Sequence, residues 1–188
     1  SLTLFAVRSA VLSLFAIFYV TATIVIYTLS LHDALPICTS NLEVARQIPV
    51  DAELSIYTNS FPIVNVLMHH PNLELIFLGG KVFPSSQVTV GVSVFQALQT
   101  IRPDWLVLGI SNVHPHQGLT GPDREEAMMK RLMMERAQKR IILADSHKLN
   151  TAEAYSVASL GDIDYLVTED SKVDYIRQNW PKSSYQVL

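Results

Sequence analysis

The chain has 188 residues, a formal net charge of −3 at pH 7 and a single cysteine, Cys38. This length is enough for one α/β domain with a proper core. The charge and the lack of any long Lys/Arg run exclude a typical duplex-binding surface, and one cysteine excludes an internal disulfide or a cysteine-based metal site. The histidines have no acidic or cysteine companions at ligand spacing, so we expect no metal and no cofactor.

Residues 1–38 differ in composition from the rest of the chain. No residue from Ser9 to Leu31 is charged, and this run is long enough for a membrane span, which is the first interpretation. A signal peptide is the second. In a third, the β-branched segment Ala22–Tyr27 is a buried strand. In a fourth, Ser30-Leu-His-Asp-Ala-Leu-Pro-Ile37 resembles a translated sequencing adapter, and residues 1–38 are a foreign leader. We favour the fourth over a membrane anchor, because the sequence after Thr39 is typical of a cytoplasmic domain without a membrane partner.

Strands and helices alternate in the order predicted after Thr39. The expected elements are a helix over 42–48, a strand over 53–57, a helix from Pro62, a strand over 73–78, a short strand over 87–90, a helix over 93–101, a strand over 105–110, a helix from Pro122, a strand over 140–144, a short strand over 154–158, a strand over 163–168, a helix over 174–180 and an edge strand over 185–188. This alternation predicts one domain, residues 39–188. Its fold class is α/β: a mostly parallel sheet with helices on both faces, in a Rossmann-like three-layer arrangement.

The stretch from Asp104 to Lys148 organises this prediction. It contains a strand, a helix and a strand, which predicts a right-handed crossover between parallel strands. Pro122 suits the first helical position, and methionines recur on one face of the helix as expected of core packing. Glu126 precedes Lys130 by four residues, which favours an ion pair on a solvent-exposed face, with a ligand contact as the alternative.

Five polar clusters follow predicted strands or begin predicted helices. They are Thr39-Ser40-Asn41, Thr58-Asn59-Ser60, Gly79-Gly80-Lys81, Ser111-Asn112 and Asp145-Ser146-His147-Lys148. Because parallel strands end at one edge of a sheet, where α/β proteins bind their ligands, we expect the clusters to converge. Hydroxyls, glycines and lysines in such a place are typical of a site for a small anion such as a sugar phosphate. The alternatives are an ordinary helix cap at Ser40 and solvated surface lysines at Lys81 and Lys148.

The stretch from Thr39 to about Asp170 resembles the C-terminal effector-sensing domain of DeoR-family transcriptional regulators. The pieces that carry the resemblance, in order, are Thr39-Ser-Asn-Leu-Glu-Val-Ala45, Tyr57-Thr-Asn-Ser60, Leu78-Gly-Gly-Lys81, Leu108-Gly109, Gly118-Leu-Thr120, Glu126-Ala-x-x-Lys130 and Leu143-Ala-Asp-Ser-His-Lys148. Single pieces are common, but the ordered set is specific.

The resemblance implies a fold related to ribose-5-phosphate isomerase and CoA transferases, and a homo-oligomer, either dimer or tetramer. It implies a phosphorylated sugar or related metabolite as the ligand of a regulator, usually a repressor and not an enzyme. Operator DNA would be bound by an N-terminal winged helix-turn-helix, for which residues 1–38 leave no room, so we interpret the chain as truncated.

By position in the motifs, the resemblance also assigns roles to individual residues. Thr39, Ser40 and Asn41 would form the phosphate loop, and Lys148 would meet the anion. Glu126 would reach the sugar hydroxyls. The pocket would be lined by Thr58, Asn59, Ser60, Gly79 and Gly80.

Two departures from the family pattern concern the ligand. Cys38 stands where the phosphate loop has a glycine, and Gly109-Ile-Ser-Asn112 replaces the usual Gly-Ala-Asp-Gly. The second change removes a carboxylate that could act as an acid or base, which disfavours isomerase chemistry. A sugar-phosphate isomerase-like enzyme on the same fold, with Glu126 as its base, is kept as the alternative function.

Overall fold

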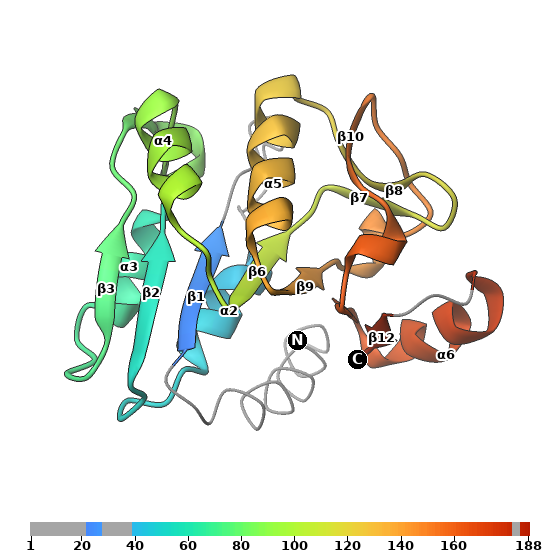
Figure 1. The fold of residues 1–188 in the computed structure, drawn as a ribbon. Coiled ribbons are helices and arrows are strands. Elements are labelled where there is room, and N and C mark those ends of the chain that lie inside the picture. Colours follow the sequence, from blue (N-terminus) through green and yellow to red (C-terminus); the bar gives the residue numbers. More distant parts are fainter. Residues whose placement is uncertain (1–21, 28–38, 182–184) are drawn as a thin grey trace.

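The computed structural model of the protein describes residues 22–27, 39–181 and 185–188 (Figure 1). Seven strands form one sheet in which every pair of neighbours is parallel. They are β1 (Ala22–Tyr27), β2 (Leu54–Thr58), β3 (Glu74–Phe77), β6 (Trp105–Gly109), β9 (Lys139–Leu143), β11 (Tyr165–Val167) and β12 (Gln186–Val187). Their order across the sheet is β12-β11-β9-β6-β1-β2-β3.

Helices cover both faces of this sheet, as Figure 1 shows. They are α2 (Thr39–Arg46), α3 (Phe61–Leu67), α4 (Val92–Thr100), α5 (Arg124–Arg136) and α6 (Asp170–Asn179). One hydrophobic cluster joins the sheet to α2 and α3, through residues such as Val44 and Ile63. A second joins it to α4, α5 and α6, through Val94, Met133 and Ile176. The predicted fold class, α/β with a parallel sheet between two helical layers, is confirmed.

Two small antiparallel sheets complete the fold. One pairs β4 (Lys81–Phe83) with β5 (Val88–Val90). The other contains β7 (Asn112–His114), β8 (Gly118–Gly121) and β10 (Tyr155–Ala158), in the order β10-β8-β7. Short 3₁₀ turns occur at η1 (Pro84–Ser86), η2 (Ser146–Lys148) and η3 (Leu160–Asp162).

β1 is an interior strand of the main sheet, paired with β2 on one side and β6 on the other. Ile24, Val25 and Ile26 are buried, as expected for a strand covered on both faces. The strand interpretation of Ala22–Tyr27 is therefore confirmed. No helix within the described ranges has the length and apolar character needed to cross a bilayer. The adapter-like segment lies outside the described residues.

Several elements differ from the sequence prediction. The strands expected over 87–90 and 154–158 exist, but they belong to the small antiparallel sheets and not to the main one. The stretch between β6 and α5, for which no strand was predicted, folds into the β7–β8 hairpin. Helix α5 begins at Arg124 and not at Pro122, because the Asp123 side chain caps it by accepting a 2.8 Å hydrogen bond from the Glu126 N–H. The last helix begins four residues earlier than predicted, at Asp170.

Candidate functional site

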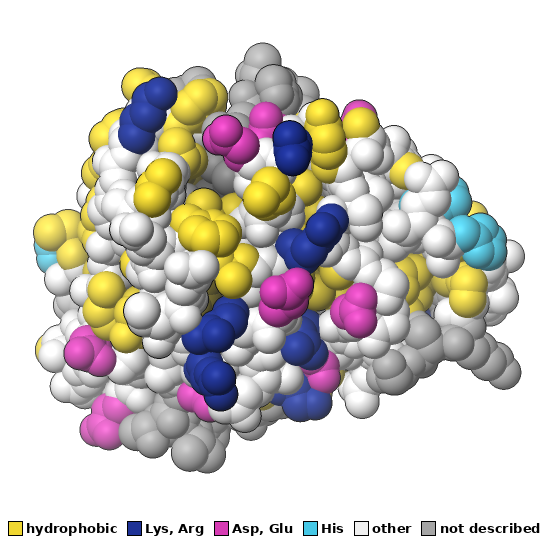
Figure 2. Space-filling view, turned by 45° about the horizontal axis from the view of Figure 1, so that its top comes forward, with side chains coloured by type: hydrophobic (Ala, Val, Ile, Leu, Met, Phe, Trp, Pro, Cys, Tyr) yellow, Lys and Arg dark blue, Asp and Glu magenta, His cyan; other side chains and the backbone are white. Residues whose placement is uncertain are grey.

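The carboxyl ends of the parallel strands lie along one edge of the main sheet, at the top of Figure 1. From β1 the chain proceeds to β2 and β3 on one side, then returns to β6 on the other and continues outward to β9. The gap between β1 and β6 is thus a topological switch point, where open α/β sheets bind ligands. Figure 2 turns this edge toward the reader and shows Lys and Arg side chains beside Asp and Glu in the middle of the view.

The predicted cluster Thr58-Asn59-Ser60 follows β2 at this edge, and all three residues are buried. The Leu78 N–H donates to the Thr58 carbonyl over 2.7 Å, which joins the ends of β2 and β3. Asn59 Nδ2 donates to the Thr89 carbonyl and the Thr89 N–H donates to the Asn59 carbonyl, each over 2.9 Å. Asn59 therefore holds β5 against the main sheet, a structural role that the sequence did not suggest.

The cluster Gly79-Gly80-Lys81 follows β3 and adjoins the first one. A Cβ on Gly80 would lie 2.7 Å from the Val90 carbonyl oxygen and 2.9 Å from Ser93 Oγ, so the close approach of β5 and α4 requires glycine there. Lys81 is exposed and belongs to β4. In the sheet order, β6, β1 and β2 separate β3 from β9, so the clusters that follow these two strands lie on opposite sides of β1.

On the other side of β1, the clusters Ser111-Asn112 and Asp145 to Lys148 follow the neighbouring strands β6 and β9. Lys148 Nζ lies 3.3 Å from Asp145 Oδ2, and its side chain is 26% exposed. A cation in this position is accessible at the edge and already oriented by its neighbour. Asn112 Nδ2 donates over 2.8 Å to Thr151 Oγ1, in the loop that follows Lys148.

A further polar cluster, which the sequence analysis missed, follows β11. The Glu169 side chain accepts hydrogen bonds from Ser146 Oγ over 3.2 Å and from Thr168 Oγ1 over 3.1 Å. Both Thr168 and Glu169 are buried. The rule that found the other clusters, polar residues directly after a buried strand, applies to these two as well.

Glu126 and Lys130 form an ion pair in the first turns of α5, which begins at the same end of the molecule as the carboxyl edge (Figure 1). Lys130 Nζ lies 2.5 Å from Glu126 Oε1, and the two side chains are 1% and 0% exposed. The prediction that this pair lies on a solvent-exposed face is therefore wrong: it shares the packed face of α5 with Ala127 and Met133. Glu126 Oε2 is also buried and accepts no hydrogen bond from the described residues.

The first cluster, Thr39-Ser40-Asn41, forms the start of α2, and Asn41 is fully buried. A helix start presents backbone N–H groups that suit an anion. Cys38, the departure noted in the phosphate loop, lies outside the described residues.

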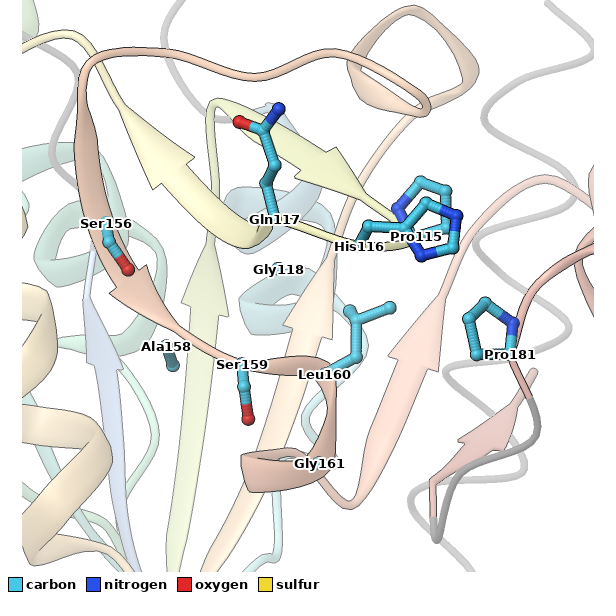
Figure 3. A pocket seen from close by; sticks show the side chains of 10 residues that line it. All are labelled: Pro115, His116, Gln117, Gly118, Ser156, Ala158, Ser159, Leu160, Gly161 and Pro181. Atoms are coloured by element: carbon cyan, nitrogen blue, oxygen red, sulfur yellow. The ribbon is translucent and has the colours of Figure 1, made fainter.

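Figure 3 shows a cavity of about 300 Å³ that lies apart from all the predicted clusters. It is lined by the β7–β8 turn, including His116 and Gln117, and by the segment that leads into η3. Its Ser159 hydroxyl already donates to Asp162 Oδ2 over 2.7 Å, and these two residues form a capping box. One polar side chain of this cavity is therefore already engaged within the fold. No group of three or more metal-ligating side chains was found within the part of the chain that the structure describes.

Comparison with known proteins gives one family match. The model of the DeoR C-terminal sensor domain matches residues 34–170. The HTH-type transcriptional regulator GlpR of Haloferax volcanii is 33% identical over 131 residues, covering 70% of this chain and 51% of the relative. The HTH-type transcriptional repressor GlcR of Bacillus subtilis is 32% identical over 117 residues, covering 62% of this chain and 45% of the relative. The chain thus spans about half the length of these relatives.

Among solved structures, ribose 5-phosphate isomerase A from Methanocaldococcus jannaschii is similar, with a TM-score of 0.46 and 15% identity. The match covers 79% of this chain and 53% of that chain.

Proposed function

The chain belongs to the family of DeoR C-terminal sensor domains, and from this premise we propose that it binds a phosphorylated sugar or a related anionic metabolite. Binding would control a transcriptional regulator of the repressor type. The observation that carries the proposal is the set of polar clusters at the carboxyl edge, on both sides of the switch point between β1 and β6.

The edge offers groups for both halves of such a ligand. The Lys148 ammonium is the cation placed to meet a phosphate, and the start of α2 at Thr39 and Ser40 adds backbone N–H donors. Among the residues that the structure describes, none donates a hydrogen bond to Glu126 Oε2, and burying this acceptor in that state costs free energy that a ligand hydroxyl would recover. The proposed effector is therefore a hydroxylated phosphate ester. Ser111 on one side of β1 and the Thr58–Ser60 segment on the other would line its binding site.

The relatives extend this proposal to the whole protein. Because the chain spans about half of each relative, the DNA-binding half is a separate segment in the proposed full-length regulator, which would act as a cytoplasmic dimer or tetramer. The interior strand β1 precedes the proposed sensor domain, 39–188, and completes its sheet by pairing with β2 and β6. Experiments on it should therefore use the full 188-residue chain.

A thermal-unfolding screen tests the proposal. The full chain is heated with a panel of pentose, hexose and triose phosphates, each beside its unphosphorylated counterpart. A cognate effector at 100 times its Kd should stabilise the fold by about 2.7 kcal/mol, and the counterpart should not. Lys148→Met should abolish most of the effect. Lys172→Met, which removes an exposed lysine from α6, should leave it intact. No response to any phosphate in a broad panel would refute the proposal.

A sugar-phosphate isomerase remains the second candidate, because Glu126 is a buried carboxylate at the same edge. Ser111 stands where the family pattern has an aspartate, so this chain lacks that second carboxylate. We expect no turnover of pentose or hexose phosphates. Turnover by the wild type that is lost in Glu126→Gln would establish the enzyme instead.

A further inference from the structure

We propose that Asn112 and Thr151 are positioning residues, which fix Lys148 at the carboxyl edge and do not themselves contact the effector. This inference rests on the proposed function in taking Lys148 as the anion contact. It changes the role predicted for Asn112 and adds a residue, Thr151, that belongs to none of the polar clusters.

The two residues form a hydrogen-bonded relay that ends on the backbone of Lys148. Asn112 Nδ2 donates to Thr151 Oγ1 over 2.8 Å, and Thr151 Oγ1 donates to the Lys148 carbonyl over 2.8 Å. A parallel β-bridge between Val113 and Leu149 runs beside this relay. The backbone directly after Lys148 is thereby attached to the first residues of β7.

A second clamp holds the same loop from the neighbouring strand β8. Thr120 Oγ1 accepts a 2.9 Å hydrogen bond from the Glu153 N–H. Asn112 and Thr120 are themselves partners in the β7–β8 ladder. The antiparallel hairpin between β6 and α5 therefore serves as a rigid support for the segment from Lys148 to Glu153.

The Lys148 ammonium, at the tip of the side chain, has a contact of its own. It lies 3.3 Å from Asp145 Oδ2, while Asp145 Oδ1 accepts from the His147 N–H over 3.1 Å. A long lysine side chain normally loses much rotamer freedom when it binds an anion. The Asp145 contact restricts the side chain beforehand, and the bond from Thr151 fixes the backbone that carries it. Both reduce the cost of ordering the lysine when an anion binds, which is the usual benefit of preorganisation.

The first test is a double-mutant cycle on the full chain, with inorganic phosphate as the probe. Thr151→Val should weaken phosphate binding by about three- to tenfold, the loss expected for one hydrogen bond. Thr151→Ser keeps the hydroxyl and should bind within about twofold of the wild type. In a Lys148→Met background, Thr151→Val should cause no further loss, because its effect acts through the lysine. An equal loss in both backgrounds would overturn the inference.

Thr100 provides a matched control. Its Oγ1 also donates to a carbonyl three residues earlier, that of Ala97, over the same 2.8 Å, but in α4 and at the surface. Thr100→Val removes the same type of bond away from the edge. It should leave phosphate binding unchanged. A loss equal to that of Thr151→Val would show a general effect of the substitution.

A ligand-free measurement separates this inference from the proposed function. The lysines are reductively methylated with ¹³C-formaldehyde and dimethylamine–borane as the hydride donor, and the Lys148 signal is assigned by its disappearance in Lys148→Arg. In the wild type it should stand apart from the signals of exposed lysines, and in Thr151→Val and Asn112→Ala it should move toward them. If it stays in place, the positioning role is wrong even where phosphate binds. If the Lys148 signal moves but no phosphate ester binds, the positioning role is supported and the proposed ligand is wrong.

Discussion

The Glu126–Lys130 pair places one charge of each sign inside the α5 face of the core, with both side chains almost fully buried. Two ions lose their hydration there, and the single contact between them offsets only part of that loss. The pair is therefore poor evidence for added stability. A role in ligand binding gives a better reason for an acceptor, Glu126 Oε2, that has no donor among the described residues.

Removing one member of this pair should be costly. Lys130→Met leaves a buried carboxylate without its partner and should lower the free energy of unfolding by about 3–5 kcal/mol. The double variant Glu126→Leu/Lys130→Met should recover most of that loss, because apolar residues of similar volume replace both charges. Urea unfolding measures each variant, with Lys172→Met as the surface control. A loss below about 1 kcal/mol in Lys130→Met, the level of an exposed pair, would contradict the observed burial.

The Asp162 carboxyl makes the stability of the folded protein depend on pH. Hydrogen bonds from the Ser159 side chain, and then from its backbone N–H, lower the pKa of this carboxyl. A lowered folded-state pKa gives stability that is present above the unfolded value, near 3.9, and is lost as the pH falls through the folded value. Because Asp162 is exposed, the contribution should stay below about 1 kcal/mol.

The substitution Asp162→Asn tests this dependence. The variant should be slightly less stable than the wild type at pH 7, and the difference should shrink in acid below about pH 4. Ser159→Ala should behave in the same way, since it removes the principal donor. Unfolding curves at a series of pH values show the outcome. A difference that grows as the pH falls would have the opposite sign and would exclude this account.

At the scale of elements, Gly118 controls how the β7–β8 hairpin meets β10. Its φ is +73°, and a Cβ there would overlap the Ala158 carbonyl oxygen and lie 2.9 Å from Ser159 Cα. Gly91 also has a positive φ, +104°, but a Cβ there would meet nothing within 4 Å. A substitution at Gly91 would thus introduce backbone strain alone, and one at Gly118 would add steric overlap.

Alanine at each position should resolve the two effects. Gly91→Ala should cost about 1–3 kcal/mol from the backbone alone, because φ +104° with ψ −170° is a conformation that glycine adopts and other residues avoid. Gly118→Ala should cost about 1–3 kcal/mol more, because β10 must also move. Denaturant midpoints of the two variants provide the comparison. Equal losses would show that the hairpin and β10 do not pack as closely as described.

The elements also show what the sequence could predict. The buried apolar strands β2, β6 and β9 lie within one residue of their predicted starts, because a run of apolar residues between turn signals depends on local sequence. The β7–β8 hairpin was not predicted, since its strands are short and its turn contains Pro115 and His116. The sheet that β5 or β10 joins depends on contacts far along the chain, which no local pattern reports.

At the scale of the whole molecule, the location of the predicted site followed from topology. Polar residues after parallel strands must share an edge, so Thr58, Ser111 and Lys148 could be grouped without coordinates. The burial of Lys130 could not be predicted, because a spacing of four residues is the same on either face of a helix. Thr151 was missed for a similar reason: its bond to Asn112 joins residues 39 apart in the sequence.

The most direct test of the account is a map of the backbone amides that respond to an effector. The ¹⁵N-labelled 188-residue chain is titrated with the phosphate ester that gives the largest thermal stabilisation. We predict the largest shifts at Thr58–Ser60, Ser111, Glu126 and Lys148, with the amides around the cavity of Figure 3 unchanged. Shifts concentrated at His116, Gln117 and Ser159, with the carboxyl edge unaffected, would contradict the account.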